Sequence, residues 1–333
     1  MVDAGAGDER TDPWVYTLNR GLAQLVPLSF GYWLSIPIVD IFHHLWRSKR
    51  EAARRNHARI LARPPDDPLV EQMAHRTFRH FGRYIVELLS VQGWSLDVMR
   101  ERIDIEGDEH FDEARAYGKG VIFTSAHMGS IEVAGTLALL KGFRITSVAE
   151  RLEPKMLRDW VMACRAKMGI ELLPSARSGM KLVRRLRRGE MVALVVDMGV
   201  SGGDGLRVPF FDHETVFPAG PARLARLSGA PIVFGWAARK PGGRYLAHVS
   251  APILSNRELE AEEDAQEITR RIVDEFERAV RRYPAQWYVF RDMWSGDGRS
   301  PRLHSPSPGA QSRREGARRP HLTGHSDRLT TLI

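Results

Sequence analysis

The chain has 333 residues but a single cysteine, Cys164. One cysteine excludes an intrachain disulfide and a zinc site built from thiolates, which suits a reducing compartment. We also find no internal repeat. Hydrophobic residues make up 43% and charged residues 27%, so the chain can bury a sizeable core in one large domain or two ordinary ones.

Charge is missing from residues 21–39, "GLAQLVPLSFGYWLSIPIV". The following segment, Arg47 to Arg59, holds six Lys and Arg against one acid. An uncharged apolar stretch with a basic collar is attracted to anionic membrane surfaces. Pro27 and Pro37 break the stretch into pieces of about ten residues, whereas a spanning helix needs roughly 20. We therefore expect residues 14–60 to be a helical membrane-associating segment that inserts into the interface; burial as a hairpin against the main domain is the alternative.

Both ends of the chain are poor in large apolar residues. Residues 1–13 are polar and net acidic, so we expect a flexible N-terminus, no secretory signal peptide and a location on the cytoplasmic side. Residues 295–333 are rich in Pro, Gly, Ser and Arg, with seven Arg against three acids. Such a composition cannot bury enough surface to offset its ordering entropy, which predicts a disordered basic tail. This leaves residues 61–294 as the main domain.

Apolar strands alternate with amphipathic helices in that domain. The pattern predicts a helix over residues 69–95, then short strands such as 121–126, 191–197 and 230–239 separated by helices, and a long helix over 261–284. The stretch "VPFFDHETVFPAG", 208–220, is predicted to be a loop. Strands that are apolar throughout favour an α/β fold with a central, largely parallel sheet flanked by helices. Ligands of such sheets bind at the carboxyl ends of the strands, where His127 and Asp197 lie.

His127 precedes Glu132 by five positions in "TSAHMGSIEVAG". With 12 His and 41 acids in the chain, about one to two such spacings arise by chance, and this is the one found. Within one helix the two side chains would point about 140° apart, so they meet only if His127 lies in the turn before the helix. A carboxylate at Nδ1 would then fix the tautomer and let Nε2 deprotonate a hydroxyl. The alternative is a hydrogen-bonded core histidine, with Glu132 as an acid near a helix start.

Several ordered blocks around this element resemble one family. They are "VAERLEPKML", "CRAKMGIELLP", "VVDMG", "VPFFDHETVFPAGPARLARLSGAPIV" and "YPAQWYVFRDMW". Together they resemble the bacterial lipid A biosynthesis (lauroyl/myristoyl) acyltransferases, within the glycerolipid acyltransferase superfamily. "VAERL" and "FPAGPARLARLSGA" resemble the phosphatidylinositol mannoside acyltransferase branch. The resemblance extends from about Trp14 to Trp294.

The resemblance implies transfer of a fatty acyl group from acyl-CoA or acyl carrier protein to a hydroxyl of a membrane glycolipid or phospholipid. It implies His127 as the base, Glu132 as the residue that orients it, and no metal or further cofactor. The residues implied to bind substrate are Glu150, Arg151, Arg165, Asp197, Phe210 and Phe211. It also implies work at the cytoplasmic face of the bacterial inner membrane, as a peripheral or monotopic protein on an anionic surface. Where the family often has Asn-Trp, this chain has Ser130 and Ile131, a departure that bears on the acceptor.

Several of these residues also have a purely structural explanation. Phe210, Phe211 and Phe217 are expected to line an acyl-chain groove or to pack in the core. The basic run from Arg184 to Arg188 would meet phosphate or complement a helix end. A non-catalytic lipid-binding protein on the same scaffold is the alternative function. Nucleic acid is not an expected partner, because no helix-turn-helix or aromatic RNA platform is readable.

Overall fold

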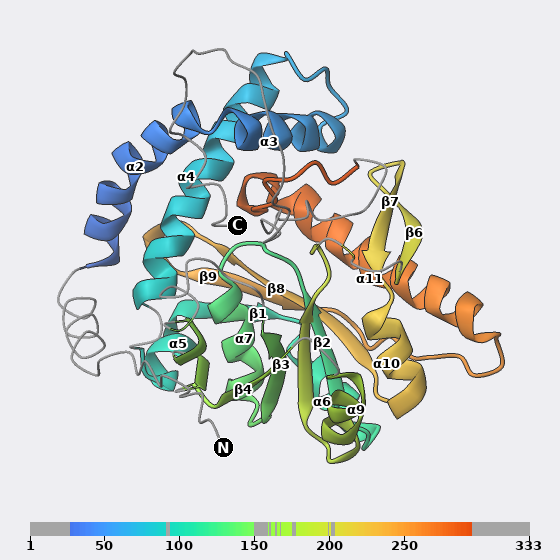
Figure 1. The fold of residues 1–333 in the computed structure, drawn as a ribbon. Helices are drawn as coiled ribbons and strands as arrows, with labels where there is room; N and C mark the ends of the chain where they lie inside the picture. Colours follow the sequence, from blue (N-terminus) through green and yellow to red (C-terminus); the bar gives the residue numbers. More distant parts are fainter. Residues whose placement is uncertain are drawn as a thin grey trace, which may run out of the picture.

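The computed structural model describes residues 27–90, 94–149, 159, 161–163, 165–166, 168–174, 178–198, 200 and 204–294. A seven-stranded sheet in the order β1-β9-β8-β2-β5-β3-β4 forms its centre (Figure 1). The strands are β1 (Ile103–Glu106), β2 (Val121–Ser125), β3 (Ile145–Ala149), β4 (Ile170–Pro174), β5 (Met191–Val195), β8 (Ile232–Arg239) and β9 (Tyr245–Val249). All neighbouring pairs are parallel except β8 and β9. The predicted α/β fold with a largely parallel sheet is confirmed.

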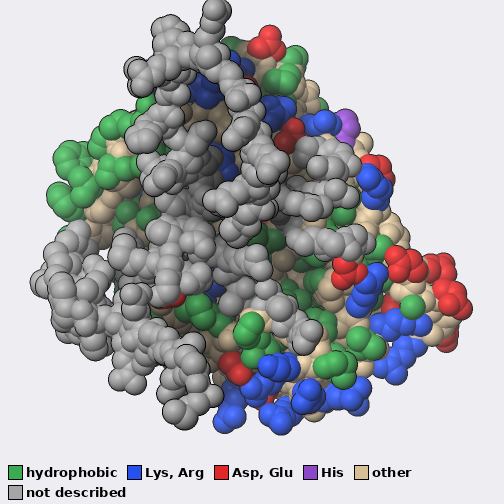
Figure 2. Space-filling view, in the orientation of Figure 1, with side chains coloured by type: hydrophobic (Ala, Val, Ile, Leu, Met, Phe, Trp, Pro, Cys, Tyr) green, Lys and Arg blue, Asp and Glu red, His purple; other side chains and the backbone are tan. Residues whose placement is uncertain are grey.

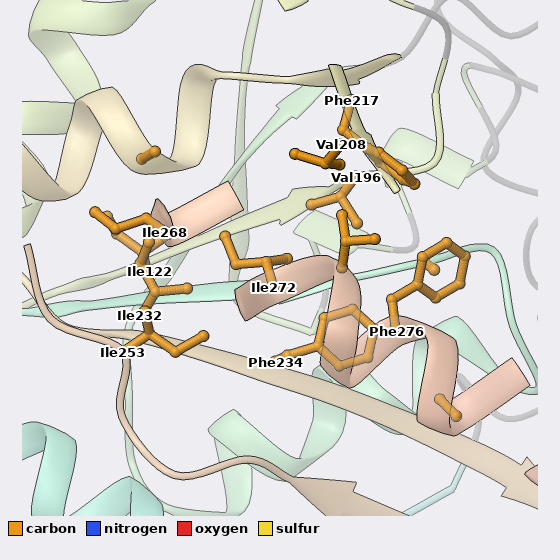
Figure 3. Close-up of a cluster of buried hydrophobic side chains, with 14 of the residues drawn as sticks. Ile122, Val196, Val208, Phe217, Ile232, Phe234, Ile253, Ile268, Ile272 and Phe276 are labelled. Carbon is orange, nitrogen blue, oxygen red and sulfur yellow. The ribbon is translucent and has the colours of Figure 1, made fainter. Parts of the chain in front are cut away.

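The central strands are apolar because helices cover both faces. Every residue of β2 and of β8 is buried. Met99, Phe111 and Leu137 belong to the core on one face, which is covered by α5 (Leu96–Arg102), α6 (Glu109–Ala116) and α7 (Ile131–Leu140). The other face is covered by α9 (Gly179–Arg187), α10 (Gly220–Ser228) and α11 (Ala261–Arg282). Figure 3 shows Ile272 and Phe276 of α11 against Ile232 and Phe234 of β8 in this second core.

Three N-terminal helices form a separate layer: α2 (Leu28–Leu45), α3 (Arg47–Ile60) and α4 (Pro68–Ser90). α2 lies along α4 (Figure 1), and the approach is so close that a Cβ at Gly82 would be 2.3 Å from Val39 Cγ2. α3 is held to the segment after α11, because Asn56 Nδ2 donates to the carbonyls of Val289 and Arg291 over 3.0 and 2.8 Å. The basic helix α3 therefore packs on the main domain.

α2 differs from the sequence prediction. Pro27 precedes the helix, but Pro37 lies inside it and does not divide it into two pieces. Proline within a helix removes one backbone hydrogen bond, and packing along α4 offsets that loss. No helix in the described part of the chain combines the length and apolar content that crossing a bilayer requires.

The stretch predicted as a loop after Asp197 is also different. It forms the antiparallel hairpin β6 (Gly205–Phe210) and β7 (His213–Pro218), separate from the main sheet. The burial of β6 alternates, with Leu206, Val208 and Phe210 inside. That period of two is a strand signal, and the prolines and charges among the apolar residues obscured it.

A buried histidine of α3 makes stability depend on pH. His57 is 2% exposed, its Nε2 lies 2.7 Å from Thr77 Oγ1, and burial lowers its pKa from 6.5 to about 4. The folded state therefore holds this histidine neutral, while the unfolded chain takes up a proton below pH 6.5. Lowering the pH from 7.5 to 5.5 is expected to cost about 1.4 kcal/mol at this site. Urea unfolding at both pH values measures it: His57→Gln should lose about that much less stability than the wild type, and equal losses would refute the assignment.

Candidate active site

His127 and Asp197 follow two neighbouring strands. β2 and β5 pair in parallel with Ser125 opposite Val195, so both chains leave the sheet at the same carboxyl edge. His127 stands in the turn that leads from β2 into α7, and Asp197 is the second residue after β5. The predicted location of both residues at strand ends is confirmed.

The two side chains are hydrogen bonded. His127 Nδ1 lies 2.7 Å from Asp197 Oδ1, and the His127 amide donates to Asp197 Oδ2 over 2.8 Å. Trp287 Nε1 also donates to Oδ2, over 3.0 Å. The Asp197 side chain has no exposed surface, whereas that of His127 is 24% exposed. A buried carboxylate thus fixes an imidazole that reaches the surface.

Asp197 is ionised in this setting. Burial by itself raises the pKa of its carboxyl, but the charge that His127 carries when protonated and the hydrogen bonds from His127 and Trp287 outweigh burial and hold the pKa below its ordinary value. An ionised carboxylate accepts hydrogen bonds and donates none, so Nδ1 carries the proton. Nε2 of the neutral imidazole then carries the lone pair that can take a proton from a substrate.

The prediction that Glu132 occupies Nδ1 of His127 is wrong, because Asp197 occupies that nitrogen. Glu132 is 5% exposed in the first turn of α7, and its Oε1 accepts from Arg165 Nη2 over 3.3 Å. The helix directs Glu132 toward residue 165, while the turn directs the histidine toward the neighbouring strand. The structure thus brings four of the predicted residues, His127, Asp197, Glu132 and Arg165, together as two pairs.

Backbone hydrogen bonds hold each residue of the turn that carries His127. The carbonyl of His127 accepts from the Tyr288 amide over 2.8 Å. The amides of the next three residues donate to the carbonyls of Ala126, Gln286 and Ala237, over 2.7, 2.7 and 2.8 Å. Gly129 has φ +61°, and a Cβ there would lie 1.9 Å from the Ala237 oxygen, so no other residue fits.

Arg239 anchors the same turn from the end of β8, and the sequence analysis missed it. Its Nη2 donates to the Gly129 carbonyl over 3.0 Å and to the Tyr288 hydroxyl over 2.7 Å, and its Nε pairs with Glu87. The side chain is 5% exposed. The sequence does contain a signal for it. The neighbouring strands β8, β2 and β5 are apolar, and each ends at or just before a polar residue of the site. These residues are Arg239, His127 and Asp197, respectively.

Comparison with known proteins decides the family. The model of the bacterial lipid A biosynthesis acyltransferase family matches residues 11–295. This chain belongs to that family. The protein is therefore an acyltransferase of lipid biosynthesis, as the resemblance of the sequence blocks implied.

Several similar proteins are acyltransferases by name. The phosphatidylinositol mannoside acyltransferase of Mycobacterium tuberculosis (strain CDC 1551 / Oshkosh) is 28% identical over 258 residues, which cover 74% of this chain and 78% of that protein. The protein of the same name from Mycolicibacterium smegmatis is 27% identical over 74% of this chain and 80% of its own. The lipid A biosynthesis palmitoleoyltransferase of Escherichia coli (strain K12) is 28% identical over 49% of this chain and 53% of its own. Among solved structures, the 1-acyl-sn-glycerophosphate acyltransferase PlsC of Thermotoga maritima gives a TM-score of 0.32 at 14% identity, covering 61% of this chain and 88% of that one.

The remaining predicted site residues of the acyltransferase have other positions. Phe210 and Phe211 are 0% and 3% exposed, and Phe210 stacks on Phe276 with 5.0 Å between ring centroids. They pack in the core, one of the two readings that the sequence left open, and do not present a groove surface. Glu150 and Arg151 lie outside the described residues.

Arg291 is a second residue that the sequence analysis missed. Its Nη2 donates to the backbone carbonyl of Asp197 over 3.0 Å. Burial lowers the pKa of its guanidinium. The block "YVFRDMW" contains this arginine, and its place next to Asp197 follows from the path of the chain after α11.

Proposed function

We propose that this acyltransferase moves a fatty acyl group from a thioester, acyl-CoA or acyl carrier protein, to a hydroxyl of a membrane glycolipid or phospholipid. The observation that carries the proposal is the pair of His127, partly exposed, and Asp197, buried and ionised. The named relatives, which are phosphatidylinositol mannoside and lipid A acyltransferases, support a hydroxyl-bearing lipid as the acceptor.

In this mechanism Nε2 of His127 takes the proton of the acceptor hydroxyl. The hydroxyl oxygen attacks the thioester carbonyl carbon and forms a tetrahedral intermediate. Collapse of the intermediate breaks the carbon–sulfur bond, and the leaving thiolate takes the proton from the imidazolium. Asp197 stabilises the imidazolium between these steps, as an orienting group does in any base–orienter pair. No covalent bond to the enzyme forms.

The negative charge on the carbonyl oxygen needs a donor from outside the turn. The amides of residues 127–130 all donate to protein acceptors, so they are engaged when substrate arrives. We infer that a side chain stabilises the oxyanion, and Arg165 is the candidate. Its Nη2 is held 3.3 Å from Glu132 Oε1, and its side chain is 17% exposed. In this account Glu132 orients the arginine, and Asp197 orients the base.

The proposal is tested by incubating the purified chain with palmitoyl-CoA and a bacterial lipid extract. Mass spectrometry should find lipids heavier by one palmitoyl group, with release of one free thiol for each acyl group transferred. Thioester that stays intact with every acceptor fraction and with both carriers would favour the lipid-binding alternative. The complete His127–Asp197 pair favours the enzyme, because a binding protein has no use for an oriented base.

We further propose that α2 attaches the enzyme to the interface of an anionic membrane at the cytoplasmic face. Six large apolar side chains on α2 are exposed: Phe30, Trp33, Leu34, Ile38, Ile41 and Leu45. Apart from the adjacent Trp33 and Leu34 they recur every three to four residues and therefore lie on one face. The left edge of Figure 2 contains this apolar patch. Arg47, at the start of the following helix, is exposed, and a cation close to an apolar face favours anionic lipid.

The membrane proposal predicts that the double variant Trp33→Ser, Ile41→Ser loses binding to phosphatidylglycerol vesicles. Burying each side chain is worth about 1.5–3 kcal/mol, so co-sedimentation should weaken at least about tenfold. The matched control is Met180→Ser, Leu227→Ser, which removes two exposed apolar side chains from α9 and α10. Equal loss in both double variants, or none in either, would count against α2 as the attachment site.

A further inference from the structure

A basic pocket of about 800 Å³ lies beside the start of α2. Its walls are the first residues of α2, the second half of α4, helix α5 and the hairpin between β8 and β9. In Figure 1 helices α2 and α4 lie on the left and α5 lies below them. Among the described residues that line it there are four Lys and Arg and no Asp or Glu. Such a pocket attracts anions.

Two of its guanidinium groups, those of Arg83 and Arg102, form no ion pair with another described residue. Arg83 makes no ion pair within the described chain, and its Nε is a buried donor without a hydrogen-bond partner there. Its guanidinium carbon lies 6.0 Å from the centre of the Tyr32 ring. Arg102 likewise faces a ring, with its guanidinium carbon 4.6 Å from the centre of Trp94. A buried donor on a charged group costs free energy unless something accepts its hydrogen bond. Within the described chain the pocket therefore lacks an acceptor for the Arg83 donor.

The other cations of the pocket are balanced to different degrees. Arg239 pairs with Glu87 at the floor. Lys240 is 3.9 Å from Asp104, and both side chains are 44% exposed, so this contact is weak. The local field is positive all the same: burial first, then the charges of Arg239, Arg83 and Arg76, lower the pKa of His80 to about 3.

Apolar groups complete the walls. Leu28, Trp94 and Val98 line the pocket together with the cations. α2 begins here with no acid in its first turn and no side chain capping it, so its amide dipoles add to the positive end. A ligand that matches cations and apolar walls at once is an amphiphile with a phosphate group, since guanidinium forks suit phosphate oxygens.

We propose that this pocket binds the phosphate ester head group of an anionic phospholipid, with Arg83 and Arg102 on the phosphate and the glycerol backbone against Leu28, Trp94 and Val98. The inference rests on the proposed function for the kind of ligand, because an enzyme that acylates membrane lipids meets such head groups. The exposed apolar face of α2 starts at Phe30, two residues from Leu28, so acyl chains have a route from the pocket to the bilayer. Arg239 joins the pocket floor to the Gly129 carbonyl of the catalytic turn.

The test is isothermal titration of the full chain with monomeric dihexanoylphosphatidylglycerol below its critical micelle concentration. Inorganic phosphate, coenzyme A and dihexanoylphosphatidylcholine are titrated in parallel. The phosphatidylglycerol is expected to bind at least about tenfold more tightly than phosphate or the zwitterionic lipid, because it alone uses both the cations and the apolar walls. Phosphate or coenzyme A binding as tightly, and in competition with the lipid, would overturn the lipid as the source of the phosphate.

Arg83→Gln and Arg102→Gln should each weaken phosphatidylglycerol binding about tenfold, which is the loss of one charge-assisted hydrogen bond. Arg100→Gln is the matched control in α5, since Arg100 is 59% exposed, pairs with Asp97 and does not line the pocket. His127→Ala should bind the lipid as the wild type does, so a failure of this inference is distinct from a failure of catalysis. Wild-type affinity in both arginine variants would refute the head-group pocket.

Discussion

His127→Ala is expected to lower kcat/KM for acyl transfer by about 10²–10⁴-fold, the contribution of a positioned general base. The loss should appear in kcat and not in KM, because the imidazole removes a proton in the reaction and does not bind the remote parts of either substrate. The side chain is 24% exposed at the carboxyl edge of the sheet. Its removal leaves both main cores intact, and circular dichroism and the melting temperature should change little.

The assay measures thiol release and acylated lipid together, with initial rates taken at saturating acceptor. His213→Ala is a suitable control, because this histidine is exposed on β7 and belongs to the separate hairpin. Its activity should equal that of the wild type. Full activity of His127→Ala would reject the base, whatever the outcome of the other variants.

Asp197→Asn is expected to reduce kcat by up to about 10⁴-fold, the loss seen when the orienting carboxylate of a catalytic histidine becomes an amide. The amide nitrogen can donate to Nδ1, which leaves the proton on Nε2 and the lone pair on the wrong nitrogen. Asp197 Oδ2 also accepts from the His127 amide and from Trp287, so Asn keeps these two bonds only when its nitrogen faces Nδ1.

Glu132→Gln is the informative comparison for Asp197→Asn. Glutamine keeps an oxygen for Arg165 Nη2 and leaves the bond at Nδ1 untouched. The expected result is retention of at least about a tenth of the wild-type kcat, because a neutral hydrogen bond replaces a charged one. Both variants are assayed well below their melting temperatures, so that unfolding does not enter the rates. A larger loss in Glu132→Gln than in Asp197→Asn would return the orienting role to Glu132.

The sequence predicted what depends on local pattern. Unbroken apolar strands with helices between them predicted the sheet, and the ordered blocks predicted the family, which the family model confirms. The ends of β2 and β5 predicted where His127 and Asp197 would lie. These features follow from burial on both faces of a parallel sheet, which favours an apolar residue at nearly every position of a strand.

The choice of partner for His127 could not be predicted from spacing. Glu132 is five residues away and Asp197 seventy, yet strand pairing brings the second to Nδ1. The two anchors of the turn, Arg239 and Gln286, come from still more distant segments. Pro37 inside α2 is a similar case, because packing against α4 overrides a local helix-breaking signal. Ser130 and Ile131 stand where the helix α7 begins, and their bearing on the acceptor stays a prediction.

The protonation of the His127 ring tests the central claim most directly. Protein labelled with ¹⁵N-histidine gives ring signals for each tautomer, and the His127 signal is assigned by its loss in His127→Ala. At neutral pH the account predicts a proton on Nδ1 and an unprotonated Nε2, a pattern that Asp197→Asn alters and Glu132→Gln leaves in place. A proton on Nε2 in the wild type, or a pattern that follows Glu132 and ignores Asp197, would contradict it.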